Sequence, residues 1–198
     1  MATGTKAALR QRLLAARRLV PDDVRAAEAE MLSRHLELVV SSGTTVCAYV
    51  PMRDEPGSMD LLMVLRRHAR RVLLPVARVT ADNVPLPLAW GEYRPGELVS
   101  GRWGLLEPPE PWLPECAVAD AALVLVPALA VDRRGVRLGK GGGFYDRSLA
   151  GIAGRARLIA LVRDEELVAE LPDEPHDVRM TDVITPARGL IELPCGND

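Results

Sequence analysis

The chain has 198 residues, of which 48% are hydrophobic and 26% charged, an ordinary composition for a soluble globular protein with a core. Its formal net charge of −2 argues against a protein that coats nucleic acid, because such proteins carry a strong basic excess. The longest apolar run, residues 121–131, is interrupted by Pro127 and is shorter than the ~20 residues that span a bilayer. Three widely spaced cysteines favour reduced thiols in the cytoplasm over a zinc site or a disulfide framework. We therefore expect a single cytoplasmic domain over residues 1–198, with no nucleic-acid or membrane partner.

A first helix is predicted from Thr5, a good N-cap residue, to about Arg18. Apolar residues recur at i, i+4 and i+7 and give it one buried face. Lys6, Arg10 and Arg17 fall within roughly 40° of one another on another face. This cationic stripe is either an ordinary solvated face or a contact surface for a polyphosphate.

Strands and helices alternate along the rest of the chain, which predicts an α/β fold: a mainly parallel or mixed central sheet flanked by helices in Rossmann-like layers. The expected elements are helices over 21–40, 59–70 and from about 144, strands over 45–50, 71–74, 86–90, 123–126, 157–162, 183–185 and 190–193, and a helical turn over 167–171. Proline and glycine crowd residues 85–114, which we expect to be long loops that frame a site. The loops 51–58 and 127–143 both leave the carboxyl ends of strands, so we expect them to share one cleft. No helix has a surplus apolar face, and we expect a monomer.

Residues 137–146, RLGKGGGFYD, combine two cations, four glycines, two aromatic residues and a carboxylate. Glycine lets main-chain amides approach a ligand closely, and a helix start adds unpaired N–H donors, so the segment predicts an anion site, above all for phosphate. Arg137 and Lys140 add positive charge, and Asp146 offers a carboxylate to a metal ion. The spacing matches neither the P-loop nor the dinucleotide-binding fingerprint. A tight glycine turn with charged flanks is the alternative interpretation.

The order of these motifs resembles the 5-formyltetrahydrofolate cyclo-ligase family, also called methenyltetrahydrofolate synthetases, over nearly the whole chain. The longest shared block runs from Val126 to Arg147 and contains the glycine-rich segment. Shorter matching pieces are Lys6-x-x-Leu9-Arg10, Tyr49-Val-Pro-x-x-x-Glu55, Arg94-Pro-Gly-Glu-Leu98, Gly104-x-x-Glu107-Pro108 and Glu170-Leu-Pro-x-Glu-Pro-His176-Asp177.

The resemblance implies an enzyme that uses ATP and Mg²⁺ to convert 5-formyltetrahydrofolate to 5,10-methenyltetrahydrofolate, with small molecules as its only partners. It implies ATP binding by Lys6, Arg10, Arg137, Leu138, Gly139, Lys140, Gly141, Gly142, Gly143, Phe144 and Tyr145. The folate would contact Val50, Glu55, Tyr93, Lys140, Gly141, Gly142, Gly143 and Phe144. Asp146 and Asp177 would bind Mg²⁺.

The chemistry of that reaction fits these residue types. The oxygen of a formamide is a poor leaving group, but it departs as phosphate after the γ-phosphoryl group of ATP has been transferred to it. The N10 atom of the folate then attacks the formyl carbon, so the protein needs no nucleophile and mainly positions substrates and stabilises negative charge. We expect Arg137 and Lys140 to be the catalytic cations.

Several residues depart from the family pattern. Glu166 stands where glutamine is usual and would weaken ligand binding if it faced the cleft, and Trp103 replaces a usual phenylalanine and enlarges a wall. Ser58 replaces a common threonine and Phe144 a common tyrosine, and both keep the size and character of the side chain. None of these changes removes a charge that the mechanism needs. A non-catalytic relative that binds folate or nucleotide, and a related ATP-dependent enzyme acting on another formamide, remain alternatives.

Overall fold

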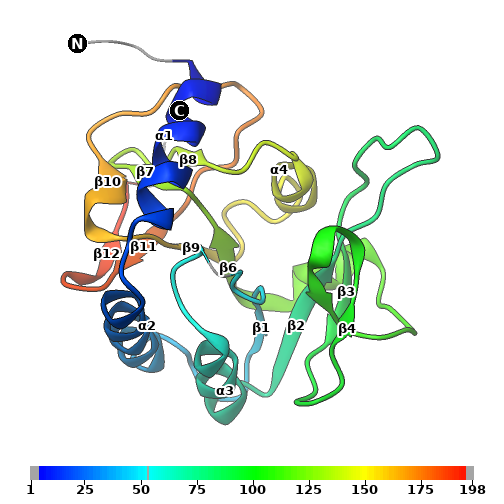
Figure 1. Ribbon diagram of the computed structural model, residues 1–198. Helices are drawn as coiled ribbons and strands as arrows, with labels where there is room; N and C mark the ends of the chain where they lie inside the picture. Colours follow the sequence, from blue (N-terminus) through cyan, green and yellow to red (C-terminus); the bar gives the residue numbers. More distant parts are fainter. Residues whose placement is uncertain (1–4, 53, 195–198) are drawn as a thin grey trace.

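The computed structural model describes residues 5–52 and 54–194, and its centre is a seven-stranded sheet in the order β12-β11-β9-β6-β1-β2-β3 (Figure 1). The strands are β1 (Thr45–Cys47), β2 (Arg71–Val76), β3 (Ala89–Glu92), β6 (Ala121–Pro127), β9 (Arg157–Leu161), β11 (Asp182–Thr185) and β12 (Gly189–Glu192). The inner strands β11, β9, β6, β1 and β2 pair in parallel, and β12 and β3 close the two edges in antiparallel pairing. The prediction of an α/β fold with a mainly parallel or mixed sheet is confirmed.

Both faces of the sheet are buried, because consecutive strand residues point to opposite sides. Leu123 and Leu125 of β6 belong to the cluster that includes residues of α2 (Asp22–Glu37) and α3 (Met59–His68). Val124 and Val126 point the other way, into the cluster that includes residues of α4 (Phe144–Leu149) and the 3₁₀ helix η2 (Glu115–Asp120). This double coverage explains the almost uninterrupted apolar sequence of β6.

The first helix, α1 (Lys6–Arg18), begins as predicted, with the Thr5 hydroxyl accepting from the amide of Ala8. It packs on a small sheet of β10 (Leu167–Val168), β7 (Ala130–Asp132) and β8 (Arg137–Leu138), in the order β10-β7-β8. Leu9, Leu13 and Leu14 of the helix contact the cluster in this small sheet. In Figure 1, α1 lies over the end of β6 from which the chain continues toward β7 and β8.

Residues 167–171 do not form the predicted helical turn. Leu167 and Val168 pair in parallel with Val131 and Asp132, after the 3₁₀ turn η3 (Asp164–Glu166). The amide of Leu171 donates to a carboxylate oxygen of the fully buried Asp132. This tertiary pairing commits the backbone groups that a helical turn would use, so the prediction was wrong.

Two other predicted segments, the first strand and the loops of 85–114, differ from the structure in their extent. The first strand ends at Cys47, so Tyr49 and Val50 belong to the loop that follows it. The predicted loops of 85–114 contain short elements: β3, β4 (Val99–Ser100), the 3₁₀ turn η1 (Arg102–Gly104) and β5 (Leu106–Glu107). Strands β4 and β5 pair with each other in a separate two-stranded sheet, which forms an arm beside β2 and β3 (Figure 1).

The order in which strands are added to the sheet changes side between the parallel strands β1 and β6. From β1 it proceeds through α3 to β2 on one side, and from β6 it proceeds through β9 to β11 on the other. A parallel sheet opens a crevice at such a switch point, beyond the carboxyl ends of the two strands. Within the described part of the chain, no helix is both long and apolar enough to cross a membrane.

Candidate active site

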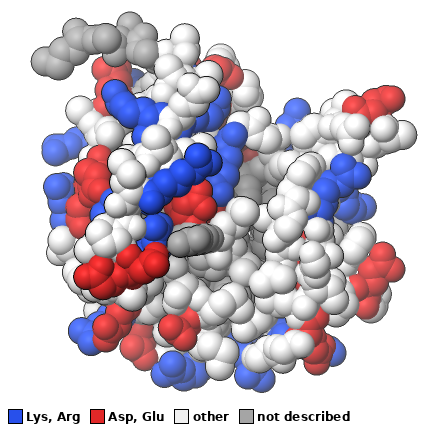
Figure 2. All heavy atoms as spheres, viewed as in Figure 1, with Lys and Arg blue, Asp and Glu red and all other residues white. Residues whose placement is uncertain are grey.

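A cleft of about 600 Å³ opens at this switch point. Its walls come from α1, the loops after β1 and β6, the glycine-rich segment, the β4–β5 arm and the loop at 174–177. Figure 2 shows the molecule hollowed between the body that carries α1 and this arm, with cationic side chains gathered on the α1 side. The expectation that the loops 51–58 and 127–143 share one cleft is confirmed.

The glycine-rich segment leaves β8 and enters α4 through residues 139–143. Gly141 and Gly143 have φ angles of +100° and +67°, in the left-handed region that residues with a Cβ rarely adopt. The guanidinium group of Arg10 lies against Gly141, and its Nε donates to the carbonyl of Gly139 over 2.9 Å. Helix α4 has only 6 residues, so the main-chain amides and the neighbouring cations contribute more to anion binding than a helix dipole does.

Three cations of the cleft are held in ion pairs, and Lys6 pairs with two carboxylates, those of Asp177 and Glu174. Arg137 Nη2 donates to Asp146 Oδ1 over 2.6 Å, and Lys140 Nζ lies 2.8 Å from Glu55 Oε1. Lys6 Nζ lies 2.8 Å from Asp177 Oδ2. Each of these cations is thus held by a carboxylate of the chain itself, at the place where the sequence predicts a phosphate group.

The Lys6–Asp177 pair alters the protonation of both groups. Burial alone would lower the pKa of Lys6 and raise that of Asp177, but the hydrogen bond between them, together with hydrogen bonds of both groups to Glu174, reverses both effects. The pKa of Lys6 therefore lies above its ordinary value and that of Asp177 below it. Both groups are charged at neutral pH, and they hold the start of α1 against the loop at 174–177.

Oxygen ligands for a divalent cation are present in the cleft, because Asp146 and Asp177 both line it. Ligand atoms of Glu174, His176 and Asp177 also lie within 4.8 Å of one another. Carboxylate oxygens are the protein ligands that Mg²⁺ prefers. His176 is largely exposed, and its Nε2 lies 3.3 Å from Glu174, a local contact.

Apolar and aromatic side chains also line the cleft. Trp103 lies edge-on to Phe144, with ring centroids 5.7 Å apart. Tyr49 and Tyr145 are among these side chains, and burial raises the pKa of both phenols, so they stay neutral. The hydroxyl of Tyr49 is buried and has no hydrogen-bond partner among the residues that the structure describes, which leaves a donor for a ligand or a water molecule.

Comparison with known proteins assigns the chain to a family. The model of the 5-formyltetrahydrofolate cyclo-ligase family matches residues 2–186. The chain belongs to the 5-formyltetrahydrofolate cyclo-ligase family. It is 56% identical over 193 residues to the 5-formyltetrahydrofolate cyclo-ligase of Mycolicibacterium smegmatis, a match that covers 98% of this chain and 100% of the relative. The Escherichia coli K12 cyclo-ligase is 32% identical over 147 residues, which cover 73% of this chain and 79% of that protein. The chain is therefore an enzyme of the cyclo-ligase family.

Solved structures agree on the fold. The NMR structure of Aquifex aeolicus 5,10-methenyltetrahydrofolate synthetase matches with a TM-score of 0.74 at 22% identity, covering 98% of this chain and 95% of that one. The corresponding enzyme from Mycoplasma pneumoniae matches with a TM-score of 0.69 at 18% identity, covering 91% of this chain and 98% of that one. At these identities the likeness concerns the arrangement of the elements alone.

Nearly all of the predicted site residues of this cyclo-ligase family member line the one cleft. They are Lys6, Arg10, Val50, Glu55, Arg137, Leu138, Gly139, Lys140, Gly141, Gly142, Gly143, Phe144, Tyr145, Asp146 and Asp177. These residues come from positions spread over most of the chain, and the switch point of the sheet brings them together.

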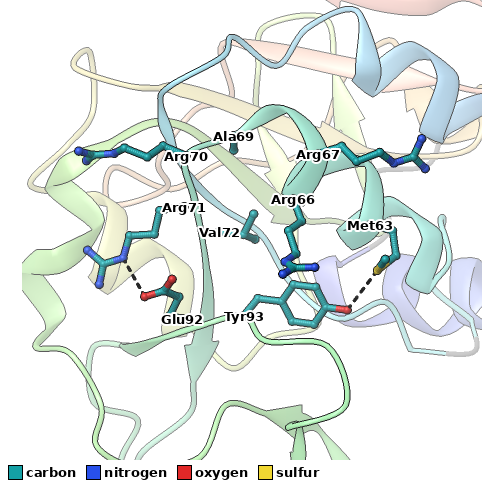
Figure 3. A pocket seen from close by; sticks show the side chains of 9 residues that line it. All are labelled: Met63, Arg66, Arg67, Ala69, Arg70, Arg71, Val72, Glu92 and Tyr93. Atoms are coloured by element: carbon teal, nitrogen blue, oxygen red, sulfur yellow. Dashed lines mark hydrogen bonds and ion pairs between the residues drawn. The ribbon is translucent and has the colours of Figure 1, made fainter.

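Tyr93 is the exception. It lines a separate pocket of about 370 Å³ and its hydroxyl points to Met63 Sδ, 3.8 Å away (Figure 3). Strand β3 runs antiparallel to β2, so the residue after its end lies at the amino end of β2, away from the cleft. The prediction that Tyr93 contacts the folate is therefore at odds with its position. Trp103, from the arm, supplies the aromatic wall instead.

Glu166 does not face the cleft. It is only 2% exposed, and both of its carboxylate oxygens accept from Arg17, over 2.6 and 2.8 Å. The third cation of the predicted stripe is therefore buried in a forked ion pair, while Lys6 and Arg10 line the cleft. Arg17 also donates to the carbonyls of Asp54 and Ala128, so the pair fastens α1 to the loops after β1 and β6.

Among the residues that line the cleft, sequence reasoning assigned no role to Tyr49 and Glu107, and it placed Trp103 in a wall only by comparison with the family pattern. Tyr49 lies near Glu55 in the sequence, and Trp103 and Glu107 lie within the predicted loops of 85–114. The signal for Trp103 was a large aromatic residue in a Gly- and Pro-rich stretch. Its contact with Phe144, 41 positions away in the sequence, depends on the fold.

Proposed function

We propose that the protein converts 5-formyltetrahydrofolate to 5,10-methenyltetrahydrofolate, with ATP and Mg²⁺, and releases ADP and phosphate. The observation that carries the proposal is the cleft at the switch point, where cations and glycine amides line the same cavity as aromatic and apolar side chains. A cavity with both kinds of lining suits a ligand pair of a triphosphate and a flat heterocycle. The family membership supports the same reaction.

In this proposal the triphosphate lies along the glycine-rich segment. Lys6, Arg10, Arg137 and Lys140 approach that segment from α1 and from the segment itself, and they would contact the phosphate oxygens in place of their present carboxylate and carbonyl partners. Phosphoryl transfer depends mainly on positioning and on stabilising charge spread over the equatorial oxygens. Of these cations, Arg137 and Lys140 are assigned to the transferred group.

The folate would lie against the aromatic side chains, with its formyl group facing the glycine-rich segment. The formyl oxygen attacks the γ-phosphorus and the bond to the β-phosphate oxygen breaks, which leaves ADP and an iminium phosphate. The N10 nitrogen then attacks the formyl carbon, the carbon–oxygen bond breaks, and phosphate departs as the ring closes. The N10 proton leaves to solvent or phosphate, so no covalent bond to a side chain forms.

The carboxylates of Asp146 and Asp177 fit Mg²⁺ by ligand type and by their shared place in the cleft. A bound Mg²⁺ ion neutralises part of the negative charge on the phosphate oxygens. Lys6 and Arg137, which now pair with these carboxylates, would turn to the nucleotide.

The appearance of the methenyl product tests this function directly. We expect its absorbance to rise when the protein is mixed with 5-formyltetrahydrofolate and MgATP, with one ADP formed per product. Tight binding of both ligands without product would support a non-catalytic relative instead. Turnover of another formamide, but not of this folate, would support the related ATP-dependent enzyme.

Replacing Asp146 by asparagine is expected to raise the Mg²⁺ concentration needed for half-maximal rate several-fold, because the amide binds the cation less well than the carboxylate does. The measurement is the initial rate as a function of free Mg²⁺ at saturating ATP. Asp173→Asn, outside the cleft, is the matched control. An unchanged Mg²⁺ requirement in the Asp146 variant would remove Asp146 from the metal site.

A further inference from the structure

Glu107 differs from every other buried carboxylate that the structure describes. The others each have a cationic partner: Glu55 pairs with Lys140, Asp132 with Arg134, Glu166 with Arg17, and Asp182 with Arg157. Glu107 is 7% exposed and has no ion pair with any described residue. A buried, unpaired carboxylate is costly, so its presence calls for a further partner.

The residues around Glu107 meet only part of the hydrogen-bonding capacity of its carboxylate. Its Oε1 accepts from the amide of Ala77 over 2.9 Å, and Oε2 has no hydrogen-bond donor among the described residues. Burial raises the pKa of Glu107, and the hydrogen bond from Ala77 offsets this only in part. Gly101 leaves room for the side chain, because a Cβ at that position would collide with Oε2.

Glu107 lines the cleft, as does Ala77, whose amide donates to its carboxylate. The apolar residues Pro75, Leu88, Leu105 and Leu106 line the same cleft. A pocket of this kind holds a ring by apolar contact, and its few polar groups fix the orientation of that ring. Glu107 supplies an acceptor, which selects a ring that presents N–H donors at its edge.

We propose that Glu107 determines specificity for the folate by accepting hydrogen bonds from the N–H groups of its 2-amino-4-oxopyrimidine ring. This inference rests on the proposed function and adds an orientation to it. The ring edge faces β5, and the formyl group at the other side of the heterocycle faces the glycine-rich segment. Glu107 is a binding residue in this scheme and takes no part in phosphoryl transfer.

The test compares the full-length protein with Glu107→Gln, in which one carboxylate oxygen is replaced by an NH₂ group that cannot accept. We expect the KM for 5-formyltetrahydrofolate to rise roughly tenfold or more, with the KM for ATP unchanged. Wild-type protein should bind the 2-desamino analogue of the folate more weakly by a similar factor, whereas the variant should distinguish little between the two ligands. Glu92→Gln, a substitution of the same kind outside the cleft, is the matched control.

Gly101→Ala provides a second test that keeps the carboxylate but displaces it, and it should also weaken folate binding while ATP binding is preserved. Thermal unfolding of each variant confirms that it is folded. If wild-type protein forms methenyl product but folded Glu107→Gln keeps both its folate KM and its preference over the desamino analogue, this inference is wrong and the proposed function stands. Wild-type protein that forms no product contradicts the proposed function itself.

Discussion

Arg137→Ala is expected to lower kcat about 100-fold, which corresponds to the loss of roughly 3 kcal/mol of transition-state stabilisation from one charged donor. The residue is 9% exposed, and its side chain is fixed by Asp146 and by the carbonyl of Pro127. Its Nε atom is buried and has no hydrogen-bond partner in the described part of the chain, so the guanidinium keeps a donor for a ligand. A donor held in advance and shielded from water acts strongly on the charge of a transferred phosphoryl group.

The measurement is steady-state kinetics with both substrates, together with thermal unfolding of the variant. Arg133→Ala is the matched control, because Arg133 is exposed and makes no ion pair with any described residue. A folded Arg137→Ala enzyme with the kcat of the wild type would contradict the placement of the triphosphate along the glycine-rich segment. A rise in the KM for ATP at constant kcat would assign Arg137 to binding alone.

Glu166→Ala is expected to destabilise the protein by about 3–5 kcal/mol, because it leaves the guanidinium of Arg17 buried without its counter-ion. Arg17 is 1% exposed, and the forked contact with Glu166 is its one ion pair among the described residues. Equilibrium unfolding in urea measures the loss. The kcat of the folded fraction should stay close to that of the wild type, since neither Arg17 nor Glu166 lines the cleft.

The double variant Arg17→Met/Glu166→Leu separates the cost of a lone charge from the value of the pair. We expect it to recover part of the lost stability, because apolar side chains of similar size often replace a buried ion pair at little cost. Recovery stays incomplete, since the carbonyls of Asp54 and Ala128 lose their donor. A loss below about 1 kcal/mol in Glu166→Ala would show that this pair contributes no more than a surface pair does.

The sequence predicted well those features that depend on local chemistry. The N-cap of α1, the glycine turns at 141 and 143 and the apolar strand β6 each follow from a few neighbouring residues. The cleft itself could be predicted because parallel strands place their following loops at one edge of the sheet. The single domain, the monomer and the cytoplasmic location stay predictions.

The differences between prediction and structure depend on partners that lie far away in the sequence. Tyr93 was assigned to the folate because it stands where the family often has tryptophan, but the antiparallel direction of β3 places it beside the amino end of β2, away from the cleft. The sequence left open whether Glu166 faces the cleft, because its partner Arg17 lies 149 positions earlier. Residues 167–171 have a helical pattern, yet pairing with β7 outweighs that weak local preference.

In the proposed mechanism, the ion pairs of the cleft would couple nucleotide binding to metal binding. Lys6 and Arg137 hold Asp177 and Asp146 in the absence of ligand, so a triphosphate that takes over the two cations frees two carboxylates for a divalent ion. By thermodynamic reciprocity, each ligand then raises the affinity for the other by the same factor. The empty enzyme should therefore retain little Mg²⁺ on its own, and the nucleotide and the metal should arrive as a cooperative pair.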